Sequence, residues 1–392
     1  MQLSIGIGNS SKIDGYEAGF EAASIVKEQL IGASPDFVFV FSNIGYEHQD
    51  ILDAVAEVLG DMPQSGATFG GIIGREFVDE SMYAVQIAGL KSNTIQFYNF
   101  KSANAVNQPF QAGENIGQRV AAVAQDGNRV LFLFPDFRTN LTRLFDGIEK
   151  HCNIPFIGGG SGDNLKFQQC YQFHDGEVME NACCAVLMVG DFELMTIVTH
   201  GSEPLSDAQV VTKCTGNVIY EIDDKPALDV ASEGLGQAIT PENITSAICL
   251  MGIGFKTAYS PNLLSPYIVH AIHGFNFNNG SCIVQTEVTS GSEIRFMRRD
   301  PHGVLESARV GAEKLSKALD SLNVTPKFIC QFDCAGRGKC FVGDDVHKGI
   351  AMVQEAFKHS IPWMGSFAFG EISSIKGKNY FYNYTATLSA FY

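Results

Sequence analysis

The stretch Phe37-Val-Phe-Val-Phe41 has two close counterparts later in the chain, and this repetition is the strongest indication of the fold. They are Val130-Leu-Phe-Leu-Phe134 and Phe328-Ile-Cys-Gln-Phe332. Each follows a small-residue segment of helical character that contains a glycine, and these glycines are Gly19, Gly113 and Gly311. Strands that are apolar almost throughout are typical of sheets covered on both faces, which indicates an α/β architecture.

The surroundings of these strands repeat as well. Each strand is followed by a polar loop, a second helix, a glycine-punctuated strand that leads to a carboxylate, and one further strand. The glycines that open these strands are Gly70, Gly158 and Gly365, and the carboxylates are Glu76, Asp163 and Glu371. Any α/β protein alternates helices and strands, but three matches at nearly constant spacing favour three related units. The sequence therefore predicts an α/β fold of repeated helix-strand-helix-strand-strand units with mixed sheets, in two domains, residues 1–215 and 216–392.

Residues 245–299, between the second and third units, have a different character. The turn Asn278-Asn279-Gly280 is typical of a hairpin, and apolar runs such as Ile248–Met251 lie around it. We expect residues 245–299 to form strands and turns. We expect residues 203–227 to be the crossing between the two domains.

Charge and composition exclude several classes of partner. The chain has 27 Lys and Arg against 43 Asp and Glu, a net charge of −16, so nucleic acid and anionic membranes are not expected partners. No stretch reaches the ~18 apolar residues that a membrane helix needs. The start of the chain lacks the features of a secretory signal, and ten cysteines are too sparse for a disulfide scaffold. We therefore expect a cytoplasmic protein with reduced thiols and no membrane insertion.

Several motifs together give a resemblance to a known family. They are Pro155–Asp163, Pro266–His270, Asp333-Cys-Ala-Gly-Arg-Gly338, Gly365–Glu371 and Asn383-Tyr-Thr385. With these motifs the chain resembles, over nearly its whole length, the FIST family, whose members pair a FIST N-terminal and a FIST C-terminal domain.

The resemblance implies a ligand-sensing module of signal transduction rather than a catalyst. It implies a small-molecule ligand and a separate signalling partner. One bacterial branch of the family looks like haem-containing nitric oxide sensors that work with histidine kinases, which makes haem b a candidate cofactor. Two positions depart from the family pattern, since Arg is common where His270 stands and His is common where Tyr382 stands. The resemblance therefore leaves the ligand open.

The loop that follows the third repeated strand is the richest candidate site, because ligands of open α/β sheets bind beyond the carboxyl ends of strands. Arg337 offers a planar donor fork suited to a carboxylate, and glycines beside it permit close backbone approach. The candidate ligand-binding residues are Cys334, Gly336, Arg337, Gly338, Gly365, Glu371 and Asn383. The alternative is a tight turn in which Arg337 pairs with Glu371 for structure alone.

Cys334 supports a second hypothesis from another class. Arg337 and Lys339 beside it favour the thiolate, which suggests a Cys-dependent enzyme acting on a small carboxylate-bearing substrate, although the sequence fixes no base for it.

Metal ligands are harder to find in the sequence. Cys330, Cys334 and Cys340 lack the paired spacing of a zinc site. For an axial haem ligand the candidate is His270, because His273, three residues along the same strand, faces the opposite side.

Overall fold

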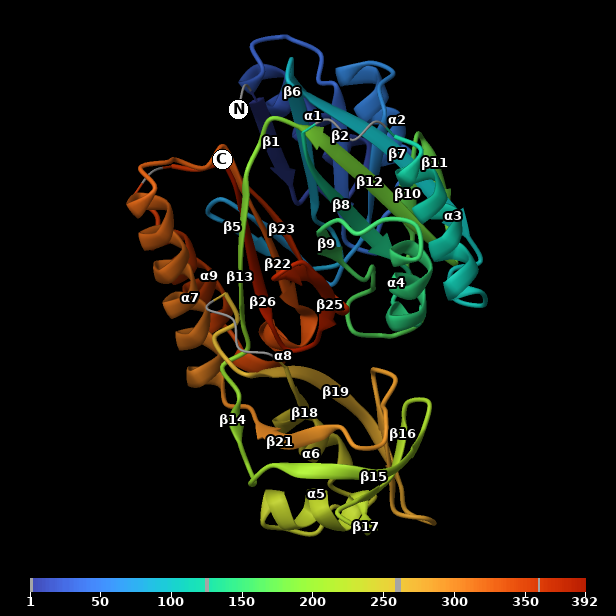
Figure 1. Cartoon of the computed structure of the whole chain (residues 1–392). Helices are drawn as coiled ribbons and strands as arrows, with labels where there is room; N and C mark the ends of the chain where they lie inside the picture. The colour runs from blue at the N-terminus through green and yellow to red at the C-terminus, as the bar shows by residue number, and fades with distance from the viewer. Residues whose placement is uncertain (1–2, 124–126, 258–261, 359) are drawn as a thin grey trace.

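The computed structural model describes residues 3–123, 127–257, 262–358 and 360–392. Within these residues the chain forms three α/β units and one inserted domain (Figure 1). The mixed α/β fold expected from the sequence is confirmed.

The three units share one order of elements, strand-helix-strand-helix-strand-hairpin-strand. The first unit consists of β1 (Leu3–Ser10), α1 (Gly15–Gln29), β2 (Phe37–Ser42), α2 (His48–Leu59), β3 (Gln64–Thr68), β4 (Ile72–Gly74), β5 (Phe77–Asp79) and β6 (Val85–Ser92). The second consists of β7 (Ile95–Ala103), α3 (Pro109–Ala121), β8 (Asn128–Pro135), α4 (Leu141–Glu149), β9 (Phe156–Gly159), β10 (Gln172–His174), β11 (Glu177–Met179) and β12 (Ala182–Gly190). The third consists of β13 (Leu194–Thr199), α7 (Pro301–Ser321), β22 (Phe328–Cys334), the 3-10 turn η1 (Ala335–Arg337), α8 (Lys339–Val342), α9 (Asp345–Glu355), β23 (Trp363–Ala368), β24 (Glu371–Ile375), β25 (Lys378–Tyr382) and β26 (Ala386–Phe391).

Each unit builds a sheet with the same strand order. The orders β1-β6-β2-β3, β7-β12-β8-β9 and β13-β26-β22-β23 are equivalent, and the strands β2, β8 and β22 occupy the same place in each. In each sheet this strand is parallel to the next one, β3, β9 or β23, and antiparallel to the strand on its other side. The expected equivalence of the three repeated strands is thereby confirmed. The strands β1, β7 and β13, which open the units, were not predicted.

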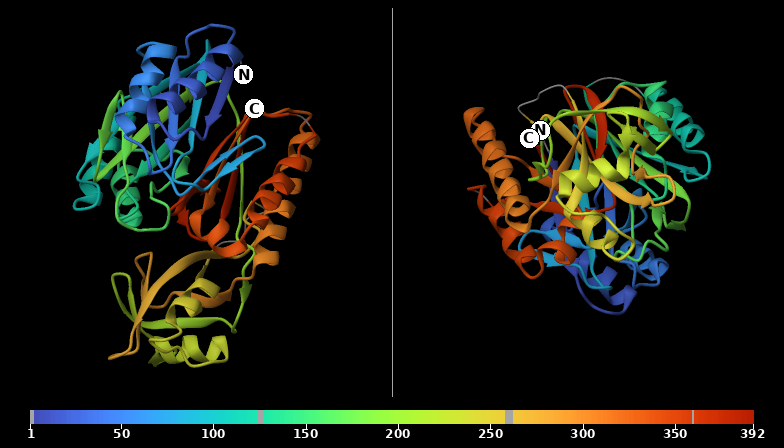
Figure 2. Two further views of the ribbon diagram at one scale, coloured as in Figure 1. Left: turned by 180° about the vertical axis from the view of Figure 1, so that it is seen from behind. Right: turned by 90° about the horizontal axis from the view of Figure 1, so that it is seen from below.

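The short hairpins are exchanged around the three units. The hairpin β4–β5 of the first unit joins the sheet of the third, β10–β11 of the second joins that of the first, and β24–β25 of the third joins that of the second. The exchange is a closed cycle, and it ties the three sheets into one body, seen from behind in Figure 2.

The inner faces of the sheets meet in one aromatic core. Phe39 contacts Phe132, and Phe41 contacts both Phe134 and Phe332, with ring centroids 4.9, 5.4 and 6.0 Å apart. Alternate residues of the same strands point outward and are buried under helices. The helices α1 and α2 cover the first sheet, α3 and α4 the second, and α7 and α9 the third. The repeated Phe-rich runs are therefore the centre of the body.

The glycine alignment predicted for the first unit was wrong. In the structure Gly66 of β3 is equivalent to Gly158 and Gly365, because each pairs with a residue of the neighbouring parallel strand, Val40, Leu133 or Gln331. A Cβ at these three glycines would lie only 1.8, 2.2 and 2.2 Å from the carbonyl oxygen of that residue. The glycines are therefore required for packing between strands.

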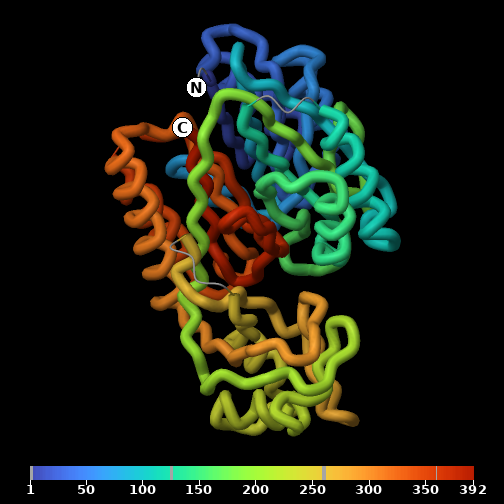
Figure 3. Tube along the Cα trace, viewed as in Figure 1, coloured from blue at the N-terminus to red at the C-terminus, as the bar shows by residue number. Residues whose placement is uncertain are grey.

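The inserted domain interrupts the third unit between β13 and α7. It consists of β14 (Glu203–Pro204), β15 (Gln209–Thr215), β16 (Val218–Ile222), β17 (Lys225–Pro226), α5 (Ala227–Leu235), α6 (Ile244–Leu250), β18 (Met251–Lys256), β19 (Tyr267–Asn276), β20 (Ser281–Val284) and β21 (Glu293–Arg298). We call it the insert domain. Its sheet closes on itself, since β18 pairs with both β19 and β21. The trace in Figure 3 shows one segment entering it from the body and one returning to α7.

The expectations for this region are partly confirmed. The predicted hairpin at residues 278–280 joins β19 to β20. Residues 203–227, expected to be a crossing between domains, instead supply strands β14 to β17 of the insert domain. Residues 244–250, expected to include a strand at Ile248–Met251, form the helix α6, and Cys249 is exposed on it. The boundary predicted after residue 215 falls at the end of β15, directly before the turn to β16.

Candidate functional site

The loop after β22 lies where the body meets the insert domain. Arg337 is almost fully buried, with 3% of its surface exposed. Its Nη1 and Nη2 donate to the carbonyl oxygens of His200 and Val304 at 3.3 and 3.1 Å, and its Nε lies 3.6 Å from Asp333 Oδ2. Arg337 therefore holds the end of β13 and the first turn of α7. The pairing with Glu371 that the sequence suggested is replaced by these partners.

Glu371 is fully buried at the start of β24. Its Oε2 accepts hydrogen bonds from the backbone nitrogen and the hydroxyl of Thr385, at 3.1 and 2.8 Å. Its Oε1 has no hydrogen-bond partner among the described residues. Burial, with a smaller contribution from Asp333, raises the pKa of Glu371 to about 8, so the carboxyl group is protonated at neutral pH.

The structure contradicts the expected activation of Cys334. The side chain is buried, and burial together with Glu371 raises its pKa far above the ordinary value, against the weaker opposite effect of Arg299. Burial raises the pKa of Cys340 as well, to about 11. A thiol held in the protonated form is a poor nucleophile, so this loop lacks the reactive thiolate that the enzyme hypothesis needs.

The loop glycines approach the protein's own groups. A Cβ at Gly338 would lie 2.2 Å from Glu80 Oε2, and one at Gly336 would lie 3.1 Å from the ring of Tyr384. The Glu80 carboxylate accepts hydrogen bonds from the Lys339 backbone nitrogen at 2.9 and 3.1 Å. Burial raises the pKa of Glu80 to about 7. The backbone N–H of Lys339 in this loop is thus already hydrogen-bonded to Glu80, a carboxylate of the first unit.

Sequence reasoning missed Arg299, which follows β21. Arg299 as a whole is 2% exposed. Its guanidinium lies 3.6 Å from the ring centroid of Tyr384 and 4.0 Å from that of Phe341. It donates to the carbonyl oxygens of Cys249 at 2.8 Å and Gly336 at 2.5 Å. Arg299 thereby connects helix α6 of the insert domain to the predicted loop. A possible signal was the pair Arg298-Arg299 at the end of a strand, directly before Asp300-Pro301.

We call Arg299, Asp333, Arg337, Glu371 and Tyr384 the junction cluster. Asp333 is buried, and burial raises its pKa in spite of the nearby Arg337. Tyr384 has a φ angle of 61°, in the left-handed region that side chains rarely adopt. The cluster thus combines two buried arginines, two buried carboxyl groups and a strained tyrosine at the joint between two parts of the fold.

Asn383 is a second tie across this joint. Its backbone nitrogen donates to the carbonyl oxygen of Val269 at 3.0 Å, and its side-chain Oδ1 accepts from the Ala271 nitrogen at 3.0 Å. Both partners lie on β19. Asn383 therefore fixes the insert domain to the hairpin end of the third unit.

His270 lies on β19 between these partners. It is buried and His273 is exposed, which confirms that the two face opposite sides of the strand. The His270 ring centroid lies 4.7 Å from that of Phe381 and 5.7 Å from that of Phe255. Burial lowers the pKa of His270 to about 3 and keeps the imidazole neutral. An axial imidazole binds haem iron end-on through a ring nitrogen and needs room there for the porphyrin, whereas His270 is buried and packed against these two rings, so its surroundings do not fit haem.

Other features bear on cofactors and on location. Within the residues that the structure describes, no cluster of three or more His, Cys, Asp or Glu side chains is arranged to hold a metal ion. No helix in the described part of the chain is long and apolar enough to cross a membrane.

Comparison with protein families identifies this arrangement. The FIST N domain matches residues 36–225, and the FIST C domain matches residues 227–374. The chain belongs to the FIST family. FIST domains are sensor domains of signal transduction, and the border between the two matches lies inside the insert domain. Each match thus contains part of the third unit or of its insert.

Relatives of this FIST protein span its whole length. An uncharacterized protein of Mycobacterium bovis is 24% identical and one of Mycobacterium tuberculosis is 25% identical, each over 99% of this chain and at least 99% of their own length. A protein of Methanocaldococcus jannaschii is 25% identical over 83% of this chain and 64% of its own length. A solved structure of PurLQS from Thermotoga maritima aligns with 99% of this FIST protein and 72% of its own chain, at 10% identity and a TM-score of 0.24. At this TM-score the likeness carries no argument.

Proposed function

We propose that this FIST protein is a non-catalytic sensor of a small ligand and that the junction cluster is its responsive element. The observation that carries the proposal is Glu371, a fully buried carboxyl group that is protonated at neutral pH and has one oxygen without a partner among the described residues. Buried polar groups that are incompletely hydrogen-bonded call for an explanation, and a ligand or a change of state is one.

The cluster is well placed to transmit a change. Arg299 joins the insert domain to Gly336 of the body, and Asn383 of the body is joined to β19 of the insert domain. A ligand that changes the surroundings of Glu371 or Arg337 alters the charge balance among these buried groups. Because Arg299 of the same cluster ties the insert domain to the body, the altered balance shifts the insert domain between two positions. A separate signalling protein, such as a histidine kinase, reads that shift.

The enzyme alternative is the weaker proposal. It needs a thiolate at Cys334, and burial holds that thiol in its protonated form. Haem b is likewise a prediction with little support at His270. An absorbance spectrum of the purified protein tests it, since a Soret band between roughly 350 and 450 nm that shifts with nitric oxide requires bound haem.

A thermal-shift screen of small organic carboxylates tests the sensor proposal. A ligand at about 100 times its Kd stabilises the native state by about 2.7 kcal/mol, which is readily measured. We expect such a ligand to raise the Tm of the wild type and to raise the Tm of Arg299→Lys by a smaller amount. Arg295→Lys is the matched control, because among the described residues Arg295 donates only within the insert domain, to Tyr267 and Ser206. If the ligand acts equally on both variants, the junction cluster is not the responsive element.

A further inference from the structure

The loop after β8 is the counterpart of the Asp333–Cys340 loop in the second unit, but it is open to solvent. Phe137 and Arg138 lie in it, and the Arg138 side chain is 40% exposed. Arg337, in the equivalent loop of the third unit, is 3% exposed. The arginine that an external ligand can reach is therefore Arg138.

Three phenylalanines from separate loops meet beside Arg138. The ring centroid of Phe167 lies 6.1 Å from that of Phe137 and 5.2 Å from that of Phe369, and Phe137 and Phe369 are 5.8 Å apart. Phe167 is 60% exposed and the other two are half-buried. The Arg138 guanidinium lies 5.6 Å from the Phe137 ring. The three rings and the arginine form one small surface, which we call the aromatic site.

Buried groups hold the exposed ring in place. The Asp163 carboxylate, 2% exposed, accepts hydrogen bonds from four consecutive backbone nitrogens, those of residues 166–169. Phe167 has a φ angle of 54°, which is rare for a bulky side chain. An exposed aromatic ring on a strained backbone costs stability, and such a cost is characteristic of functional sites.

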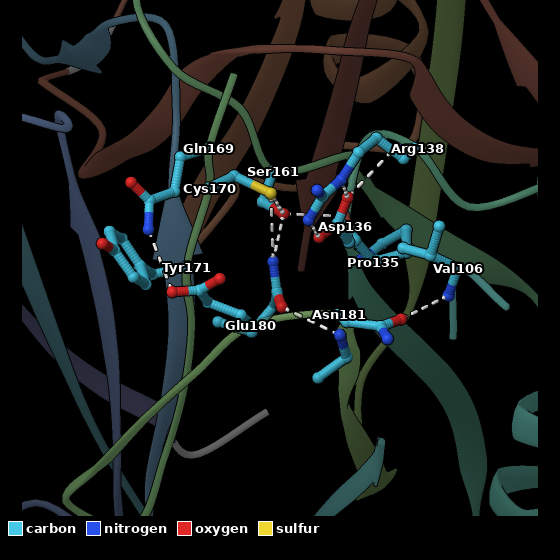
Figure 4. A network of polar contacts seen from close by, with 12 residues as sticks. Val106, Pro135, Asp136, Arg138, Ser161, Gln169, Cys170, Tyr171, Glu180 and Asn181 are labelled. Atoms are coloured by element: carbon cyan, nitrogen blue, oxygen red, sulfur yellow. Dashed lines mark hydrogen bonds and ion pairs between the residues drawn. The ribbon is translucent and has the colours of Figure 1, made fainter. Parts of the chain in front are cut away.

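The arginine is fixed in the same way. Its Nε and Nη2 donate to the two oxygens of the fully buried Asp136, at 2.9 and 2.6 Å, which directs Nη1 away from that pair (Figure 4). Beneath them Ser161, Cys170 and Gln172 form a hydrogen-bonded base. The nearby Glu180 carboxylate is engaged by Gln169 at 2.9 Å. Both the rings and the guanidinium are thus preorganised.

We propose that the aromatic site binds a planar aromatic ligand that carries an anionic group such as a carboxylate. The rings stack on or edge against the planar part, and the free side of Arg138 hydrogen-bonds the anion. This inference rests on the proposed sensor function and gives its ligand class. It also gives a route to the junction cluster, because Phe369 is separated from Glu371 only by Gly370, whose φ angle is 108°. A ligand that displaces Phe369 acts directly on the backbone of Glu371.

The test uses 2-naphthoate as probe, titrated by calorimetry into the wild type, Phe167→Ala and Arg138→Lys. We expect wild-type binding, weakened about tenfold by loss of the stacking ring in Phe167→Ala. Arg138→Lys keeps the charge beside Asp136 and loses the fork, so it should weaken naphthoate and leave neutral 2-naphthylmethanol unaffected. Phe20→Ala is the matched control, because Phe20 is an aromatic residue 43% exposed on α1.

Two results overturn the inference. One is no binding of 2-naphthoate to the wild type at millimolar concentration, and the other is equal binding to the wild type and Phe167→Ala. The sensor proposal fails separately. If naphthoate binds through Phe167 but Arg299→Lys does not alter its thermal effect, the aromatic site stands and the junction cluster does not.

Discussion

Replacing Glu371 by Gln tests whether the buried carboxyl group is neutral in the folded protein. The pKa of Glu371 is raised from 4.5 to about 8, so the native state retains a proton that the unfolded chain has already lost above pH 4.5. The stability associated with this group is full below pH 4.5 and is lost as the pH rises to about 8. The Gln variant cannot ionise, so it should lack this loss.

The magnitude follows from linkage. Each pH unit between the two pKa values changes the free energy of unfolding by about 1.4 kcal/mol. From pH 5 to pH 8 the wild type should therefore lose up to about 4 kcal/mol relative to Glu371→Gln. A constant cost of the buried amide shifts the whole curve of the variant without changing this slope.

Urea unfolding at several pH values measures the effect, with fluorescence of the single tryptophan as reporter. Trp363 is fully buried in β23, in the sheet that adjoins Glu371. Buried histidines such as His48 and His200, whose pKa values burial lowers to about 4, destabilise the protein on acidification, but they do so equally in both proteins. Glu233→Gln, at an exposed glutamate, controls for loss of surface charge. Parallel pH profiles of the wild type and Glu371→Gln would refute the reasoning.

Three further predictions concern the predicted site residues. Gly365→Ala places a Cβ about 2.2 Å from the Gln331 carbonyl oxygen and should lower the free energy of unfolding, measured in urea, by about 3 kcal/mol or more. The control Gly274→Ala, whose Cβ has no described atom within 4 Å, should lower it by less than about 1 kcal/mol. Equal losses in the two variants would contradict the strand contact. Arg337→Lys loses the donor fork to His200 and Val304 and should lower the unfolding free energy of the ligand-free protein by about 2 kcal/mol or more, and an unchanged value would return Arg337 to the role of a ligand contact. A thiol-reactive aromatic disulfide should label the exposed Cys249 quickly in the folded protein and Cys334 only on unfolding, and fast labelling of Cys334 would revive the enzyme hypothesis.

The repeat could be predicted because each unit carries a recognisable local sequence pattern. Runs such as Val130-Leu-Phe-Leu-Phe134 show both faces of a buried strand, and three of them at similar spacing define three units. The opening strand β1 was missed because its sequence, Leu3–Ser10, alternates glycine with other residues and lacks a β-branched or aromatic run. The exchange of hairpins was out of reach, since strands of three to five residues carry no information about which distant sheet they join.

The site residues were predictable as a group but their exposure was not. Cys334, Gly336, Arg337 and Glu371 do lie together, although β22 and β24 belong to different sheets, because β24 follows within two residues of β23, the parallel neighbour of β22. Arg299, which follows the insert domain and is far from this loop in the sequence, hydrogen-bonds the Gly336 carbonyl oxygen and packs over the loop beside Tyr384. A loop motif gives the chemistry of its side chains, whereas solvent access is set by whatever packs over it.

Hydrogen exchange measures whether ligand binding on the body alters the contacts that hold the insert domain in place. The backbone amide of Ala271 on β19 donates to Asn383 across the joint and is the natural reporter. With 2-naphthoate or a ligand from the screen bound, we predict altered exchange in both the segment 335–342 and the β19 segment 267–271. In Arg299→Lys the change in β19 should be lost while that in 335–342 remains. A change confined to the body in the wild type, or one that Arg299→Lys leaves intact in β19, would contradict the account.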